Sequence, residues 1–207
     1  MSAGGRPDPL HLLDLAQARV AATIADLGDD DWGRPTPCTE WSVRDVVNKM
    51  TASTQLFAAF GRRERPDPAP DLVDPAEILG DDPLAVYLDA AADCRSAWRA
   101  DGALEGTAPS TVGEFPAVPV LNARIFDTTI LGWDVAVACS LDHRIDDVQA
   151  AYVLRVARAL VPTVRAASPD RYGDPTLLDD DRPVVDRMVA VTGRDPAWRP
   201  PRPGART

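Results

Sequence analysis

Lysine is almost absent from this chain, because Lys49 is the single lysine among 22 basic residues. Histidine is nearly as scarce, with only His11 and His143, and cysteine occurs three times without any C-x-x-C spacing. Because histidines are few and no two cysteines are closely spaced, the sequence argues against a zinc finger and against a disulfide framework. The chain also has no apolar run long enough to span a bilayer and no basic-then-apolar signal sequence. We therefore expect a cytoplasmic protein with reduced thiols.

Basic residues are also fewer than acidic ones, 22 against 32. The net charge is −10 and the isoelectric point is about 4.6, which argues against nucleic acid and anionic membranes as partners. Hydrophobic residues make up 45% of the chain and charged residues 26%, as in globular domains. We predict one domain over residues 1–200 and a disordered tail over 201–207. The expected partner is a small-molecule substrate or ligand, and a homodimer stays open.

Helical periodicity accounts for most of what is present. The pattern predicts an all-α fold, a four-helix bundle with additional C-terminal helices. The predicted helices span 10–27, a segment beginning after Ser42, 84–100, 121–138, 147–166 and 183–191. In the fifth helix we expect an inward-facing set made of Val148, Ala151, Tyr152, Val156 and Leu160. We expect a helical turn near 75–79 inside the loop 61–83, and a short hairpin inside the loop 101–120.

The start of the second helix has clear signals. Ser42 is a candidate N-cap, and Asp45 three residues later completes the pattern of a capping box. Trp41 and Val46 have the spacing of a hydrophobic staple around that cap. This phase places Lys49 at the edge of the apolar face of the helix, with Ser53 one turn further on.

Two stretches carry a family resemblance. The segments "TPCTEWSVRDVVNKM" (36–50) and "ARIFDTTILGWDVAVA" (123–138) resemble two signatures of the DinB-like, mycothiol-dependent maleylpyruvate isomerase superfamily. The ending "VTGRDPAWRP" (191–200) is similar to the C-terminus of an actinobacterial branch of this family. The resemblance implies a DinB-like four-helix bundle. It also implies a central divalent metal, with one ligand from the second helix and two from the fourth.

The ligand positions of that family are substituted in this chain. By the resemblance, a histidine ligand falls on Lys49, an acidic or histidine ligand on Asp127, and a last histidine on Leu131. Leucine has no donor atom, and a lysine would first have to lose its proton. The resemblance therefore predicts a degenerate metal site, and we expect neither a metal nor a cofactor.

Three interpretations of Lys49 stay open. It could form a salt bridge with Asp127 inside the bundle. It could extend along the helix edge into water. It could also act with Asp127 as a catalytic pair that polarises or protonates a substrate. We name Ser53, Arg124 and Leu131 as candidate substrate-binding residues. Arg124 could instead take the Asp127 carboxylate away from the lysine.

Three functions follow from these interpretations. The first is a metal-independent isomerase, lyase or cyclase of specialised metabolism, which uses the former metal cavity as its pocket. The second is a non-catalytic descendant that binds a ligand or a partner chain. The third is a mycothiol-dependent, metal-binding isomerase or transferase. Cys38 precedes a helix, where a thiol can gain acidity, although it could equally be a small buried residue of the turn.

Overall fold

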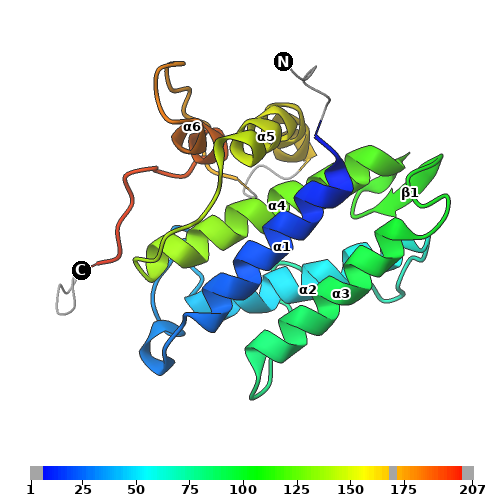
Figure 1. Cartoon of the computed structure of the whole chain (residues 1–207), viewed down its shortest axis with the longest axis horizontal. Coiled ribbons are helices and arrows are strands. Elements are labelled where there is room, and N and C mark those ends of the chain that lie inside the picture. Colours follow the sequence, from blue (N-terminus) through cyan, green and yellow to red (C-terminus); the bar gives the residue numbers. More distant parts are fainter. Residues whose placement is uncertain (1–6, 168–171, 202–207) are drawn as a thin grey trace.

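A computed structural model describes residues 7–167 and 172–201 (Figure 1). In chain order the elements are α1 (Pro9–Ala25), the short 3-10 helix η1 (Asp29–Asp31), α2 (Val43–Gly61), α3 (Pro83–Arg99), β1 (Thr107–Ser110), β2 (Gly113–Pro116), α4 (Ala117–Ala138), α5 (Asp147–Ala167) and α6 (Val184–Ala190). The predicted helices are all present, with ends that shift by a few residues.

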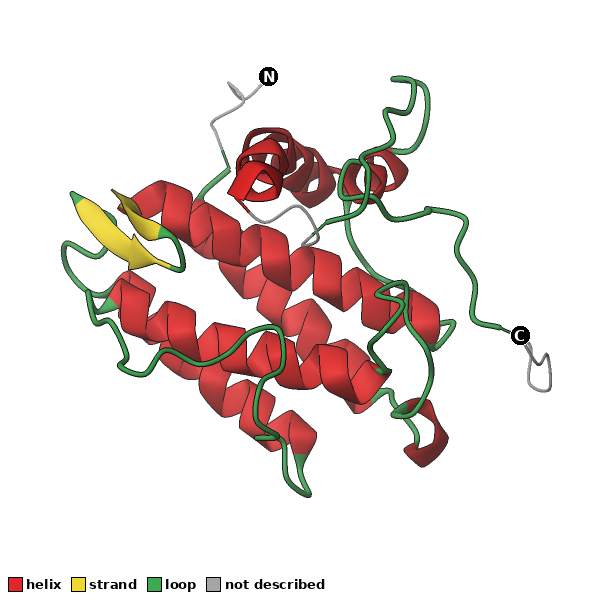
Figure 2. Ribbon diagram, turned by 180° about the vertical axis from the view of Figure 1, so that it is seen from behind, coloured by secondary structure: helices red, strands yellow, loops and turns green. Residues whose placement is uncertain are grey.

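Helices α1 to α4 form the bundle. Each of α1 and α2 packs against both α3 and α4, so a shared core runs along the centre. Helices α5 and α6 pair with each other, and α5 packs on the outer side of α4 (Figure 1). The hairpin of β1 and β2 covers one end of the bundle (Figure 2). The predicted all-α fold, a four-helix bundle with C-terminal helices, is confirmed.

The hairpin leads directly into α4. Strands β1 and β2 pair antiparallel, with Thr107 opposite Pro116. Helix α4 begins at Ala117, four residues earlier than the periodicity predicts. Pro119 lies in its first turn, where a missing N–H costs little because that group has no partner within the helix. Because proline is tolerated in the first turn but is rare inside helices, the periodicity places the start of α4 too late.

The predicted helical turn at Pro75–Leu79 is wrong. This stretch has no helix. Its backbone groups hydrogen-bond to the side chain of Asn48 on α2 instead. The Asn48 amide nitrogen donates to the carbonyls of Pro75 and Ala76 at 3.3 and 3.1 Å. Its oxygen accepts from the Ile78 amide at 3.0 Å. A side chain distant in sequence therefore holds this segment extended along α2.

The predicted orientations of Val148 and Ala151 are also wrong, because Val148 is 63% exposed and Ala151 is exposed as well. The buried face of α5 includes Ala150 and Val153, which are fully buried. Tyr152 faces inward as predicted and is only 4% exposed. Apolar residues lie on more than one side of α5. Periodicity alone does not decide which side meets α4 and α6.

None of the described helices is long and apolar enough to cross a membrane. Of the predicted tail, residues 202–207 lie outside the described part of the chain. The tail and the domain boundary at residue 200 therefore stay predictions.

Candidate functional site

The direction of Lys49 is set at the start of α2. The Ser42 hydroxyl accepts from the Asp45 amide at 3.3 Å, and the Asp45 carboxylate accepts from the Ser42 amide at 2.9 Å. This reciprocal capping box was predicted and is present. Two turns later Lys49 lies over the ring of Trp41, with Nζ 5.4 Å from the ring centroid. The aromatic face stabilises the ammonium as a cation–π pair.

Lys49 and Ser53 meet the same carboxylate on α4. Nζ of Lys49 lies 3.6 Å from Oδ1 of Asp127, and the Ser53 hydroxyl donates to Oδ2 at 3.1 Å. Residues four apart lie one above the other on a helix, which is why both reach Asp127. The Lys49 side chain is 11% exposed and that of Asp127 20%. The salt-bridge interpretation of Lys49 is therefore confirmed, and the fully solvated one is wrong.

Arg124 shares this carboxylate without displacing the lysine. Its side chain is completely buried, with Nη1 3.3 Å from Oδ2 of Asp127. It also donates to the hydroxyls of Ser53 and Thr128 at 2.6 and 2.8 Å. The guanidinium carbon lies 5.5 Å from the ring centroid of Phe57. Two cations therefore flank one carboxylate, and the buried arginine is held in place.

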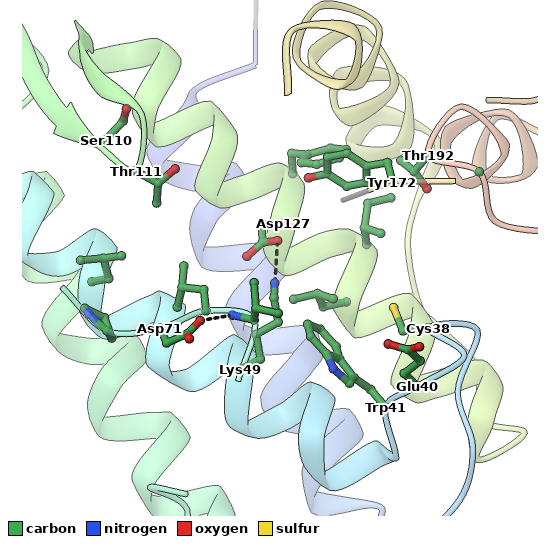
Figure 3. Close-up of a pocket in the computed structure, with 18 of the residues that line it drawn as sticks. Cys38, Glu40, Trp41, Lys49, Asp71, Ser110, Thr111, Asp127, Tyr172 and Thr192 are labelled. Carbon is green, nitrogen blue, oxygen red and sulfur yellow. Dashed lines mark hydrogen bonds and ion pairs between the residues drawn. The ribbon is translucent and has the colours of Figure 1, made fainter. Parts of the chain in front are cut away.

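A cavity of about 1200 Å³ opens in front of this pair. Figure 3 shows the Lys49 and Asp127 side chains meeting at its centre. Its walls come from α2, α4, the turn at 37–41, the loop at 65–73, the hairpin tip and two C-terminal segments at 172–173 and 192–194. Proteins commonly bind small molecules in spaces of roughly 300–1,000 Å³, so this cavity is large enough for one.

The C-terminal wall is tied to α4 by a buried ion pair. Nε and Nη2 of Arg194 donate to the two oxygens of Asp134, each at 2.7 Å. The side chain of Asp134 is 0% exposed and that of Arg194 10%. Next to Arg194, Gly193 has a φ of +82°, and a Cβ there would come within 2.4 Å of the Gly173 backbone. Glycine is therefore required at position 193 for both conformation and space.

The half-buried thiol of Cys38 contacts both members of this ion pair. Its Sγ lies 3.3 Å from Oδ2 of Asp134 and 3.3 Å from Nη2 of Arg194. Burial, reinforced by the negative charge of Asp134, raises the pKa of Cys38 to about 12. The suggestion that the helix start makes this thiol acidic is wrong. Desolvation outweighs the helix dipole here.

The two histidines lie away from the site. His11 is exposed on α1, and His143 lies in the loop before α5, where its Nδ1 accepts from the Ile145 amide at 3.1 Å. Burial lowers the pKa of His143. Across the described ranges 7–167 and 172–201, no three His, Cys, Asp or Glu residues lie together as a metal site would need.

The predicted site residues divide into two groups. Lys49, Asp127 and Leu131 line the cavity. Ser53 and Arg124 lie behind Asp127, where they hold its carboxylate, so their binding of substrate stays a prediction.

Sequence reasoning missed Arg194. The segment "VTGRDPAWRP" marked its neighbourhood but gave the arginine no role, because only the fold brings it to Asp134. Asp134 on α4 pairs with this loop arginine.

The bundle and its polar site between α2 and α4 define a DinB-like helical protein. Residues 13–136 match the model of the mycothiol maleylpyruvate isomerase N-terminal domain family, and the chain therefore belongs to that family. This confirms the resemblance carried by the two signatures.

Known proteins also match over most of the chain. Two uncharacterized proteins of Mycobacterium tuberculosis, from strains CDC 1551 and H37Rv, are each 28% identical over 188 residues, covering 90% of this chain and 98% of theirs. The crystal structure of a histidine-to-alanine mutant of mycothiol-dependent maleylpyruvate isomerase superposes with a TM-score of 0.62. That match covers 90% of this chain and 80% of the other, at 17% identity, and at this identity it shows the fold alone.

Proposed function

We propose that the chain is a metal-independent enzyme of the isomerase, lyase or cyclase type that acts on a small organic molecule in this cavity. Lys49 and Asp127 are the proposed catalytic pair. The observation that carries the proposal is their placement. An ammonium and a carboxylate lie 3.6 Å apart, largely shielded from water, at the inner end of a cavity of about 1200 Å³.

The residues at this point do not fit the divalent metal that the family resemblance implies. A dication bound by Asp127 would meet the Lys49 ammonium and the Arg124 guanidinium, which lie 3.6 and 3.3 Å from the same carboxylate. Leu131 offers no donor atom. The charge that a metal would supply is supplied here by a lysine.

The pair can move a proton without a metal. Lys49 donates a hydrogen bond to an oxygen of the substrate and stabilises the negative charge that develops there. Asp127 accepts a proton from the neighbouring carbon and returns it to another carbon, so an isomerisation leaves no net change in protons. Ser53 and Arg124 keep the carboxylate oriented throughout.

A second candidate function is non-catalytic ligand binding. Asp127 receives contacts from Lys49, Ser53 and Arg124, and each of these stabilises its negative charge. A carboxylate engaged by three side chains can hold a ligand in place without taking part in chemistry. A third candidate is a mycothiol-dependent, metal-binding isomerase or transferase, since the matched family model and the structural relative are both named for mycothiol and maleylpyruvate isomerase.

Deuterium exchange separates these candidates before the substrate is known. The protein is incubated in D₂O with a panel of small carbonyl compounds and organic acids, and NMR follows loss of the C–H signal next to the carbonyl group. The proposal expects exchange that chelators leave unchanged and that Lys49→Met and Asp127→Asn abolish. Asp93→Asn, which breaks the exposed Arg62–Asp93 pair, serves as the matched control.

Each other result points elsewhere. Ligand binding without exchange or turnover would support the non-catalytic candidate. Exchange that a chelator removes and a divalent metal restores would overturn metal independence. Exchange that survives both site variants would move the chemistry away from Lys49 and Asp127.

A further inference from the structure

The Lys49 ammonium has no hydrogen-bond acceptor among the described residues. Its distance of 3.6 Å from Oδ1 of Asp127 is an ion-pair contact, longer than the roughly 2.7–3.2 Å of an N–H···O hydrogen bond. Its other close partner is the face of Trp41, which accepts no conventional hydrogen bond. The ammonium has three N–H donors, its side chain is only 11% exposed and lines the cavity, and no described residue accepts a hydrogen bond from it.

Two cations contact the carboxylate of Asp127. Arg124 is fully buried and held by Ser53 and Thr128, so it cannot turn toward water. It contacts one carboxylate oxygen while Lys49 contacts the other. One carboxylate thus serves two cations, and of the two only Lys49 reaches the cavity. In a poorly solvated site this favours an added anion.

The walls next to Lys49 are apolar and partly aromatic. The apolar part of the lining consists of Trp41, Leu56, Phe60, Phe126, Ile130 and Leu131, and the same cavity is also lined by the charged residues Glu40, Arg65, Asp71 and Arg194. In Figure 3 the Trp41 ring lies beside the Lys49–Asp127 pair, on the same side of the cavity. A ligand that enters here meets one cationic head at the inner end and an apolar surface along its length. Recognition then depends on a single anionic group joined to an apolar body.

We propose that the cavity binds a small organic acid, with its carboxylate on the Lys49 ammonium and a flat apolar body against Trp41 and the aliphatic side chains of α4. The proposal rests on the proposed function, because it names the substrate class of the same site. The ligand carboxylate supplies the oxygen acceptors that Lys49 lacks. Asp127 then lies beside the carbon next to that carboxylate.

Matched probes test this directly. Benzoate, cinnamate and 2-naphthoate are compared with their primary amides and with the corresponding amines, by tryptophan fluorescence and by protein-observed NMR. For at least one of these compounds the acid should bind about tenfold or more tighter than its amide, because the carboxylate adds an ionic attraction to the hydrogen bond that a neutral amide also accepts from the ammonium. The amine should be the weakest binder. This comparison uses the natural chain and needs no variant to fold.

Variants then locate the head group. Lys49→Met should remove the preference for acid over amide, and Lys49→Arg should keep part of it. Asp127→Asn should tighten acid binding, since the competing carboxylate is gone. Arg65→Met is the matched control, because Arg65 is an exposed cation of the same cavity.

Four results would contradict the proposal, and one combination of results would separate it from the proposed enzymatic function. No acid binding at millimolar concentration, or equal binding of acid and amide, would overturn it. Tighter binding of the amine, weakened by Asp127→Asn, would make the site a receptor for cations. Loss of selectivity in Arg65→Met instead of Lys49→Met would place the head group at the rim. Lys49-dependent acid binding without deuterium exchange would leave this inference standing while the enzymatic proposal fails, and exchange without acid preference would do the reverse.

Discussion

The buried pair of Arg194 and Asp134 gives the sharpest test of how the cavity is built. Arg194→Met removes the guanidinium and keeps a side chain of similar length. Asp134 is then left fully buried without its arginine, and of the group formed by Arg194, Asp134 and Cys38 only the Cys38 thiol still contacts it. Breaking a buried pair by removing one partner costs about 3–5 kcal/mol, because the other charge stays buried and uncompensated. For a chain of this size that lowers the melting temperature by roughly 6–20 °C.

Two further variants make the measurement specific. Arg194→Met combined with Asp134→Leu should recover most of the loss, because an apolar pair needs no desolvation of charge. Arg144→Met is the matched control. Arg144 also lies 2.7 Å from a carboxylate, that of Asp26, but both side chains are 43% exposed. An exposed pair contributes about 0–1 kcal/mol.

Thermal and urea unfolding of the four proteins give the free energies. The ligand probes, applied to the same variants, report whether the 192–194 wall has moved. If Arg194→Met is no less stable than Arg144→Met, the buried Arg194–Asp134 pair does not hold the C-terminal segment to the bundle. The account of this cavity wall would then be wrong.

Three other predictions concern the site and its thiol. Lys49→Met should cost roughly 1–3 kcal/mol, between the values for exposed and fully buried pairs, and adding Asp127→Leu should restore much of it in urea unfolding. Lys49→His with Leu131→His should create a His-Asp-His set that binds one zinc per chain in calorimetry. The pKa of Cys38 is raised from 9.0 to about 12. The contribution of this thiol to the free energy of unfolding should therefore be complete below pH 9 and should fall as the pH rises toward about 12. At pH 8 this thiol should react with a disulfide reagent far more slowly than in unfolded chain.

Different results would contradict each of these. A Lys49→Met variant as stable as the natural chain from pH 5 to 9 would show that the lysine contributes nothing to the fold. A folded double-histidine variant without zinc affinity would show that the family's ligand positions are misassigned. Rapid modification of Cys38 in the folded protein would show that the thiol is neither buried nor held by Asp134.

Local signals carried much of the fold. The capping box of Ser42 and Asp45 and the spacing of apolar residues were sufficient to place α2 and to put Lys49 and Ser53 on one side of it. They were insufficient where a distant group decides the outcome. The segment Pro75–Leu79 is extended because Asn48 binds it, and Val148 is exposed because only one stripe of α5 meets its neighbours.

By itself the sequence determined the helices, because they depend on short-range spacing, and it indicated the family through two signature segments. Which of the three interpretations of Lys49 holds was decided by the packing of α2 against α4. Only the tertiary structure decided that Arg124 and Lys49 share the Asp127 carboxylate, that a cavity of about 1200 Å³ opens before them, and that Arg194 closes one wall. These features join residues far apart in the chain. Their energy comes from burial and from charge at close range, which exist only once the helices have packed.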